Sequence, residues 1–118
     1  MKDFKELEVW KACKNLVIMV YKNTDNFPKT EQFGLTNQLR RAAVSVPSNI
    51  AEGIGRKTNK DSSNFMYISR GSLFEIETQV IISFELAYLS DLQLEELVNQ
   101  INYCRKLVNG MINYFDKP

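Results

Sequence analysis

Histidine is absent from this chain of 118 residues. Its absence removes the commonest general base, the commonest metal ligand and the usual partner of a serine or cysteine nucleophile. Catalysis through Asp, Glu, Lys or Tyr stays open in principle. We nevertheless expect a protein that is not an enzyme and that binds no cofactor or metal ion.

Cysteine is also scarce. Cys13 and Cys104 lie far apart in the sequence, and their spacing matches neither a CxxC pair nor a metal site. Both fall on apolar stripes, so we expect two buried thiols that pack as small hydrophobic groups. A disulfide or a pair of ligands is the alternative.

Long apolar runs are missing, and so is a charge of one sign. No stretch approaches the roughly 20 apolar residues of a membrane span, and the first six residues, MKDFKE, are polar and unlike a signal peptide. The net charge of +1 gives no overall attraction to nucleic acid or anionic membrane. These absences predict a cytoplasmic protein with no membrane partner.

Helical periodicity runs through nearly the whole chain, and strand-like alternation is sustained nowhere. The length suits one domain over residues 1–118. The first predicted helix spans residues 5–26 and ends before Pro28. The second begins near Leu35, with Thr36 as its N-cap, and ends at Gly53 to Gly55. Pro47 lies inside it and predicts a kinked helix rather than two helices.

Two longer helices are predicted to follow, over residues 60–89 and from Ser90 onward. Ser90 and Gln93 form a capping box at the start of the fourth helix. An unbroken repeat then runs through Leu94, Leu97, Ile101, Cys104, Val108, Met111 and Phe115. Short links force neighbouring helices antiparallel, so we predict an all-α, up-down-up-down four-helix bundle.

The third predicted helix carries more apolar residues than one core needs. Leu73, Val80 and Phe84 mark the face toward the core, while Phe74, Ile81 and Tyr88 recur every seven residues beside it. The fourth helix offers a similar flank with Tyr103, Leu107 and Tyr114. Exposed aromatic strips are rare on monomers, so we expect Phe74, Ile81, Tyr88, Leu107 and Tyr114 to form a homo-oligomer interface. A core widened around the third helix is the alternative.

Positive charge gathers around the second helix. Residues 35–60 contain Arg40, Arg41, Arg56, Lys57 and Lys60 against one acid, Glu52, which gives a local net charge of +4. Guanidinium and ammonium groups in this number can contact the phosphates of RNA or DNA. Alternatively, the arginines pair with acids of a neighbouring helix, such as Glu75, Glu77 or Glu85.

The proline bend brings polar residues to one turn of the second helix. We expect Ser45, Asn49 and Glu52 to satisfy backbone groups freed by Pro47. A catalytic or ligand-binding pairing of Asn49 with Glu52 is the alternative. Gly71 and Ser72 are expected to allow close helix packing, because no base is present to activate a serine.

Three segments together resemble a known family. They are LEVWK at 7–11, FGLTNQLRRAAVSVPSNIAEG at 33–53 and RGSLFE at 70–75. They resemble the bacterial 23S rRNA intervening-sequence protein family, and the likeness covers nearly the full chain. The resemblance implies an up-down four-helix bundle that assembles as a ring-shaped homopentamer, in a family loosely labelled ribosomal whose biochemical role is not established.

The chain is also similar in fold to the accessory protein of diversity-generating retroelements. That relative is a basic pentameric bundle that binds nucleic acid and a reverse transcriptase, whereas this chain is nearly neutral. Two functions follow from the sequence. The first is an oligomeric module that binds RNA or a ribonucleoprotein through the basic residues, and the second is a scaffold that binds another protein and no nucleic acid.

Overall fold

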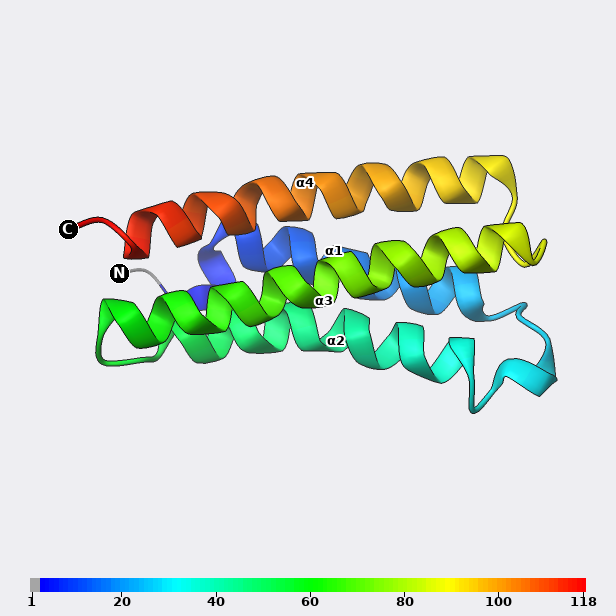
Figure 1. Cartoon of the computed structure of the whole chain (residues 1–118), viewed down its shortest axis with the longest axis horizontal. Coiled ribbons are helices and arrows are strands. Elements are labelled where there is room, and N and C mark those ends of the chain that lie inside the picture. Colours follow the sequence, from blue (N-terminus) through cyan, green and yellow to red (C-terminus); the bar gives the residue numbers. More distant parts are fainter. Residues whose placement is uncertain (1–2) are drawn as a thin grey trace.

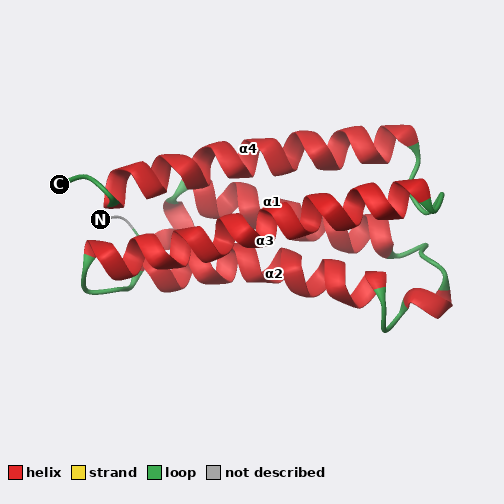
Figure 2. Ribbon diagram, in the orientation of Figure 1, coloured by secondary structure: helices red, strands yellow, loops and turns green. Residues whose placement is uncertain are grey.

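Four long helices make up most of the computed structural model, which describes residues 3–118 (Figure 1). They are α1 (Glu8–Thr24), α2 (Leu35–Ile54), α3 (Asn59–Glu85) and α4 (Asp91–Phe115). Two short 3-10 turns, η1 (Phe4–Glu6) and η2 (Lys29–Glu31), precede α1 and α2. Figure 2 shows helices and loops throughout the described chain, with no strand. The all-α prediction is confirmed.

The helices run alternately up and down, and each lies beside two neighbours. α1 contacts α2 and α4, and α3 contacts the same two helices from the opposite corner. The described chain measures 46 × 24 × 21 Å, with the long axis along the helices (Figure 1). The structure is therefore an antiparallel four-helix bundle, as the short links predicted.

The core is built from the stripes that the periodicity marks. The largest fully buried side chains come from all four helices. They are Leu16, Val20, Leu39, Val46, Ile50, Met66, Leu73, Ile76, Val80, Leu97, Ile101 and Val108. The repeat on α4 faces the axis, and its capping box between Ser90 and Gln93 is present. Burial of these side chains is the main source of the bundle's stability.

The start of α2 differs from the prediction. Thr36 lies inside the helix, and Gly34 occupies the N-cap position without a side-chain hydrogen bond. A carboxylate from η2 serves instead, because Glu31 Oε1 accepts from the Leu35 amide at 3.2 Å. The helix dipole, which is positive at this end, also stabilises the negative charge of the Glu31 carboxylate. The N-cap prediction was wrong because the acceptor comes from the preceding turn.

α2 runs unbroken through Pro47, which confirms one helix rather than two. Its ribbon changes direction near the middle in Figure 1. Nearby side chains supply hydrogen bonds there, as Asn49 Nδ2 donates to the Ser45 carbonyl at 2.8 Å and Ser69 Oγ of α3 donates to the Val46 carbonyl at 2.9 Å. These bonds reach the carbonyls of Ser45 and Val46 rather than that of Ala43, whose helical donor Pro47 removes, and one of the donors comes from α3.

α3 ends at Glu85, four residues before the predicted end at Leu89. Ala87 has a φ of 65°, and the amides of Ala87 and Tyr88 donate to the carbonyls of Phe84 and Ser83. This pair of bonds is a Schellman motif, in which the left-handed residue is usually glycine. The apolar spacing typical of a helix continues to Leu89, whereas the left-handed conformation of Ala87 ends the helix before it.

The glycine that permits close packing is Gly53, not Gly71. A Cβ at Gly53 would lie 2.8 Å from Met66 Cε and 2.9 Å from Phe65 Cβ, whereas a Cβ at Gly71 would meet nothing within 4 Å. Gly71 is exposed on the outer face of α3. The expectation for Gly71 was therefore wrong, because its side of the helix faces outward.

Candidate functional site

The five cations predicted to bind nucleic acid fall into two groups. Arg40 and Arg41 lie in the first half of α2, and Arg56, Lys57 and Lys60 lie at the turn between α2 and α3. Arg41 and Arg56 are 15 residues apart, which along a helix is about 22 Å. The fold therefore does not gather the basic residues into one compact cluster.

Arg40 is engaged inside the bundle. Its Nε donates to Thr24 Oγ1 at 3.0 Å, Nη2 donates to the Tyr21 carbonyl at 3.4 Å, and the guanidinium lies 4.6 Å from the centre of the Tyr21 ring. Both partners are in the last turn of α1, where carbonyls lack helical donors and a cation is favoured. The alternative, that Arg40 pairs with an acid of a neighbouring helix, is wrong for this residue, because its partners are the Thr24 hydroxyl and the Tyr21 carbonyl at the end of α1.

Arg41 is exposed and forms no ion pair among residues 3–118. It borders a shallow polar depression of about 300 Å³ between α2 and α3. The depression is lined by Gln38, Arg41, Ala42, Ser45, Ser72 and Glu75. Two hydrogen bonds join α2 and α3 beside it, between the hydroxyls of Ser45 and Ser72 at 3.0 Å and from Gln79 to Gln38 at 3.3 Å.

The second group of cations surrounds the turn after α2. Arg56 Nη2 bonds Glu52 Oε2 at 2.8 Å, and its guanidinium lies 4.6 Å from the centre of the Phe65 ring. Lys57 and Lys60 are exposed. Glu52 therefore pairs with Arg56 rather than supporting the bend at Pro47, which corrects its predicted role.

Glu77 and the two thiols have partners within the chain as well. Arg105 pairs with Glu77 at 3.0 Å. Cys13 and Cys104 are buried and not disulfide-bonded, and the hydrogen bond that the Cys13 thiol donates to Cys104, together with burial, raises the pKa of Cys13. The prediction of buried thiols is confirmed. In the described part of the chain, no three His, Cys, Asp or Glu side chains are placed to hold a metal ion, and no helix is long and apolar enough to cross a membrane.

The outer face of α3 is apolar and exposed. Phe74 is 51% exposed and Ile81 is 45% exposed, so these two predicted interface residues do not widen the core. The predicted interface did not include the other members of this face, which we call the α3 stripe. Its exposed side chains are Tyr67, Ile68, Phe74, Ile81, Ile82 and Leu86.

The other predicted interface residues are placed differently. Tyr88 follows the end of α3 and is half-buried, with its hydroxyl 2.9 Å from Glu31 Oε2 and its ring centre 5.3 Å from that of Phe27. Leu107 is half-buried against the core, and Tyr114 is 54% exposed on α4. Tyr88 and Leu107 therefore serve the fold of the single chain, whereas Tyr114 presents its ring outward.

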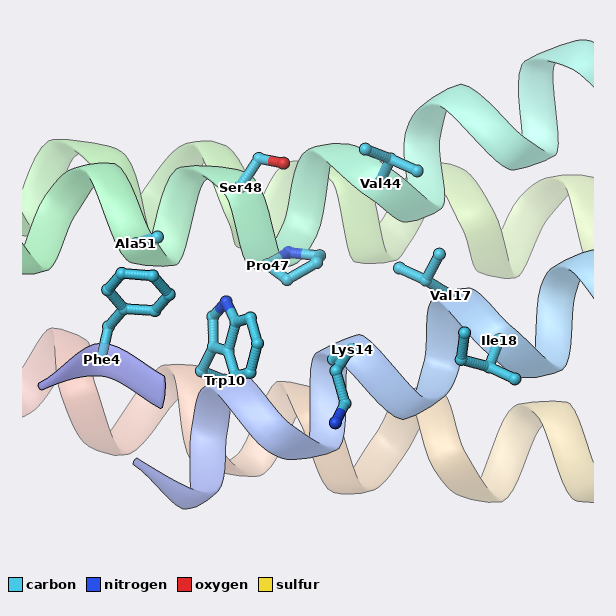
Figure 3. A pocket seen from close by; sticks show the side chains of 9 residues that line it. All are labelled: Phe4, Trp10, Lys14, Val17, Ile18, Val44, Pro47, Ser48 and Ala51. Carbon is cyan, nitrogen blue, oxygen red and sulfur yellow. The ribbon is translucent and has the colours of Figure 1, made fainter. Parts of the chain in front are cut away.

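A second apolar surface lies on the opposite side of the molecule, between α1 and α2, and we call it the α1–α2 groove. It has a volume of about 330 Å³ (Figure 3). Phe4, Trp10, Lys14, Val17, Ile18, Val44, Pro47, Ser48 and Ala51 line it. Figure 3 shows the Trp10 and Phe4 rings rising toward α2, where Pro47 and Ala51 face them.

Sequence reasoning missed this groove. Trp10 and Val17 have the helical spacing that is typical of a core stripe, but both are only half-buried. The available signal was the run of small residues on α2, Ser48 and Ala51, one turn apart on a flank outside the buried stripe. These small residues form one side of a groove only because α1 places the large side chains of Trp10 and Ile18 opposite them.

The fold and surfaces define an antiparallel four-helix bundle with exposed cations and two apolar outer surfaces. Residues 5–110 match the family described as 23S rRNA-intervening sequence protein. The chain belongs to this family, which confirms the resemblance carried by residues 7–11, 33–53 and 70–75.

A solved structure shares the fold. It is a protein with unknown function from the S23 ribosomal protein family of Bacteroides thetaiotaomicron, 21% identical, with a TM-score of 0.79. The match covers 88% of this chain and 97% of that chain. No curated protein matches this sequence significantly.

Proposed function

We propose that this protein is a non-enzymatic, self-assembling helical bundle that associates with RNA or a ribonucleoprotein through its exposed cations. The observation that carries self-assembly is the α3 stripe. Phe74 and Ile81 project from a helix whose opposite side already fills the core, so their burial requires another molecule. The family resemblance implies five copies.

The support for nucleic acid comes from the side chains that the fold leaves accessible. Arg41, Lys57 and Lys60 are exposed and have no ion pair among residues 3–118. Arg56 is exposed too, although Glu52 neutralises part of its charge. Each chain alone offers few phosphate contacts. An oligomer carries several copies of these contacts, so that once one chain has bound an RNA molecule, the effective concentration of the RNA at the other chains is raised.

Light scattering on the purified protein tests the assembly. We expect a mass several times the 13.7 kDa of one chain, and a mass equal to one chain would end this part of the proposal. Replacing Phe74 and Ile81 together by Ser should release monomers whose circular dichroism remains helical. Phe33→Ser is the control, because Phe33 is 86% exposed outside the α3 stripe.

A mobility-shift assay at low salt tests RNA binding. Changing Arg41, Lys57 and Lys60 together to Glu should weaken binding and reduce the slope of log affinity against log salt by about 2, since each lost phosphate contact on a single strand removes about 0.7. The matched control changes Lys29, Lys106 and Lys117 to Glu and alters net charge equally. Equal binding by both triple variants, or none by the unaltered protein, would contradict the proposal.

A protein-binding scaffold without nucleic acid is the second candidate. It is favoured by the engagement of Arg40 with the end of α1 and of Arg56 with Glu52, because both arginines serve the fold. Pull-down from cell extract separates the two candidates. Recovery of nucleic acid alone would count against the scaffold, and a protein partner that persists after nuclease treatment would support it.

A further inference from the structure

The two apolar surfaces of this bundle lie on different helices and face different directions. The α3 stripe points away from the axis, because Leu73, Ile76 and Val80 on the opposite side of α3 are buried. The α1–α2 groove opens beside α1, the helix that α3 does not contact. One chain therefore cannot close its own groove with its own stripe.

We propose that the α3 stripe of one copy packs into the α1–α2 groove of the next copy. This inference rests on the self-assembly proposed above and names the two surfaces that meet. The contact is heterologous, since each surface meets a different one. An open row of copies then always has an unpaired stripe at one end and an unpaired groove at the other. Growth stops only when these two surfaces meet and close a ring.

The shapes of the two surfaces correspond. Phe74 and Ile81 are seven residues apart on α3, and Val44 and Ala51 are seven residues apart on α2, so each pair is separated by about 10 Å along its helix. The whole stripe from Tyr67 to Leu86 extends over about 28 Å. The stripe is a ridge of large side chains on one helix. In the groove, Pro47 and Ala51 of α2 face α1 between larger side chains, and a ridge on another helix can pack into such a surface.

The charges beside the two surfaces differ. Residues 71–104 contain six acidic residues and no Lys or Arg. Arg70 and Arg105 flank this segment and lie over the Tyr67 and Phe74 rings, and Arg105 is paired with Glu77. Glu75 and Glu85 are exposed beside the α3 stripe, while Lys14 lines the α1–α2 groove. None of these last three charges forms an ion pair within the described chain. Opposite charge at the rims favours stripe against groove and disfavours stripe against stripe.

A mixing experiment distinguishes these arrangements. One variant spoils the stripe with Phe74→Glu and Ile81→Glu, and the other spoils the groove with Ile18→Glu and Val44→Glu. All four side chains are between 41% and 51% exposed in the single chain, so folding should survive, and circular dichroism checks it. Each variant alone should have the mass of one chain.

An equimolar mixture should then form a species of two chains and grow no further. The intact stripe of one variant meets the intact groove of the other, and the remaining pair of surfaces repels through its new glutamates. If the groove variant alone still assembles like the unaltered protein, or if the mixture stays monomeric, the pairing is overturned. A monomeric unaltered protein would overturn the proposed self-assembly as well, so the two failures are distinguishable.

The sole tryptophan gives a second measurement that needs no variant. Trp10 lines the groove and is half-buried in the single chain. Its emission should shift to shorter wavelength when a neighbouring copy covers the groove, and back when the oligomer dissociates on dilution. Emission that stays constant while light scattering reports dissociation would overturn the pairing.

Discussion

Arg40 of α2 donates from Nε to the hydroxyl of Thr24 at the last residue of α1, at 3.0 Å. The same hydroxyl donates to the Val20 carbonyl at 2.8 Å, and Arg40 Nη2 reaches the Tyr21 carbonyl at 3.4 Å. A cation from one helix thus completes the end of another, where backbone acceptors lack donors. Because of this contact Arg40 stabilises the bundle, whereas the adjacent Arg41 remains exposed.

Arg40→Ala should lower the free energy of unfolding by about 1.5–3 kcal/mol, the usual range for hydrogen bonds to a charged group. Arg41→Ala should change it by no more than about 0.5 kcal/mol, since Arg41 is an exposed residue without an ion pair. Urea denaturation at one fixed protein concentration measures both. Equal destabilisation by the two substitutions would show that the contact with Thr24 contributes little.

Ala87→Gly should stabilise the protein by about 1 kcal/mol, because a residue with a side chain pays about 1–2 kcal/mol in the left-handed conformation that glycine adopts freely. Ala87 holds a φ of 65° at the end of α3. Thermal unfolding gives the comparison. A lower melting temperature for the glycine variant would mean that the turn after α3 does not hold this conformation in solution.

Gly53→Ala and Gly110→Ala should change stability in opposite directions. A Cβ at Gly53 would meet Phe65 and Met66 below 3.0 Å, so α2 and α3 must separate, at a cost of about 1–3 kcal/mol. A Cβ at Gly110 on α4 would meet nothing within 4 Å, and the better helix propensity of alanine should add about 1 kcal/mol. Paired denaturation curves test this, and two changes of the same sign would refute the assignment of close packing to Gly53.

Alkaline pH should weaken the fold through three tyrosines. Hydrogen bonds to Asp116, Glu31 and Glu8 raise the pKa of Tyr67, Tyr88 and Tyr103 respectively. The folded chain therefore holds these protons more tightly than the unfolded chain, whose tyrosines titrate near pH 10. Their contribution to stability is complete below about pH 10 and is lost as pH rises through the folded pKa values.

Replacing Tyr88 by Phe isolates one of the three groups. The variant should lose stability less steeply than the unaltered protein as the pH rises above about 10, because one of the phenols with a raised pKa is gone. Tyr114→Phe is the matched control, since that hydroxyl has no carboxylate partner in the part of the chain described. Identical slopes for the Tyr88 variant and the control would contradict the prediction.

The sequence by itself determined the helices, the core and the topology. The repeat from Leu94 to Phe115 is a physical constraint, since residues three and four apart share one face of a helix and must be buried together. Short links then left the antiparallel bundle as the natural arrangement. The family could also be seen in the sequence, because residues 33–53 form one continuous motif.

Only the tertiary structure decided which side chains remain available for function. Arg40 and Arg41 are neighbours in the sequence, but a helix turns by 100° per residue, so Arg40 reaches α1 while Arg41 stays exposed. The α1–α2 groove likewise exists only where the side chains of Trp10 and Ile18 stand opposite the small residues of α2. Periodicity reports one helix at a time, whereas contacts and grooves between helices depend on how two of them are placed.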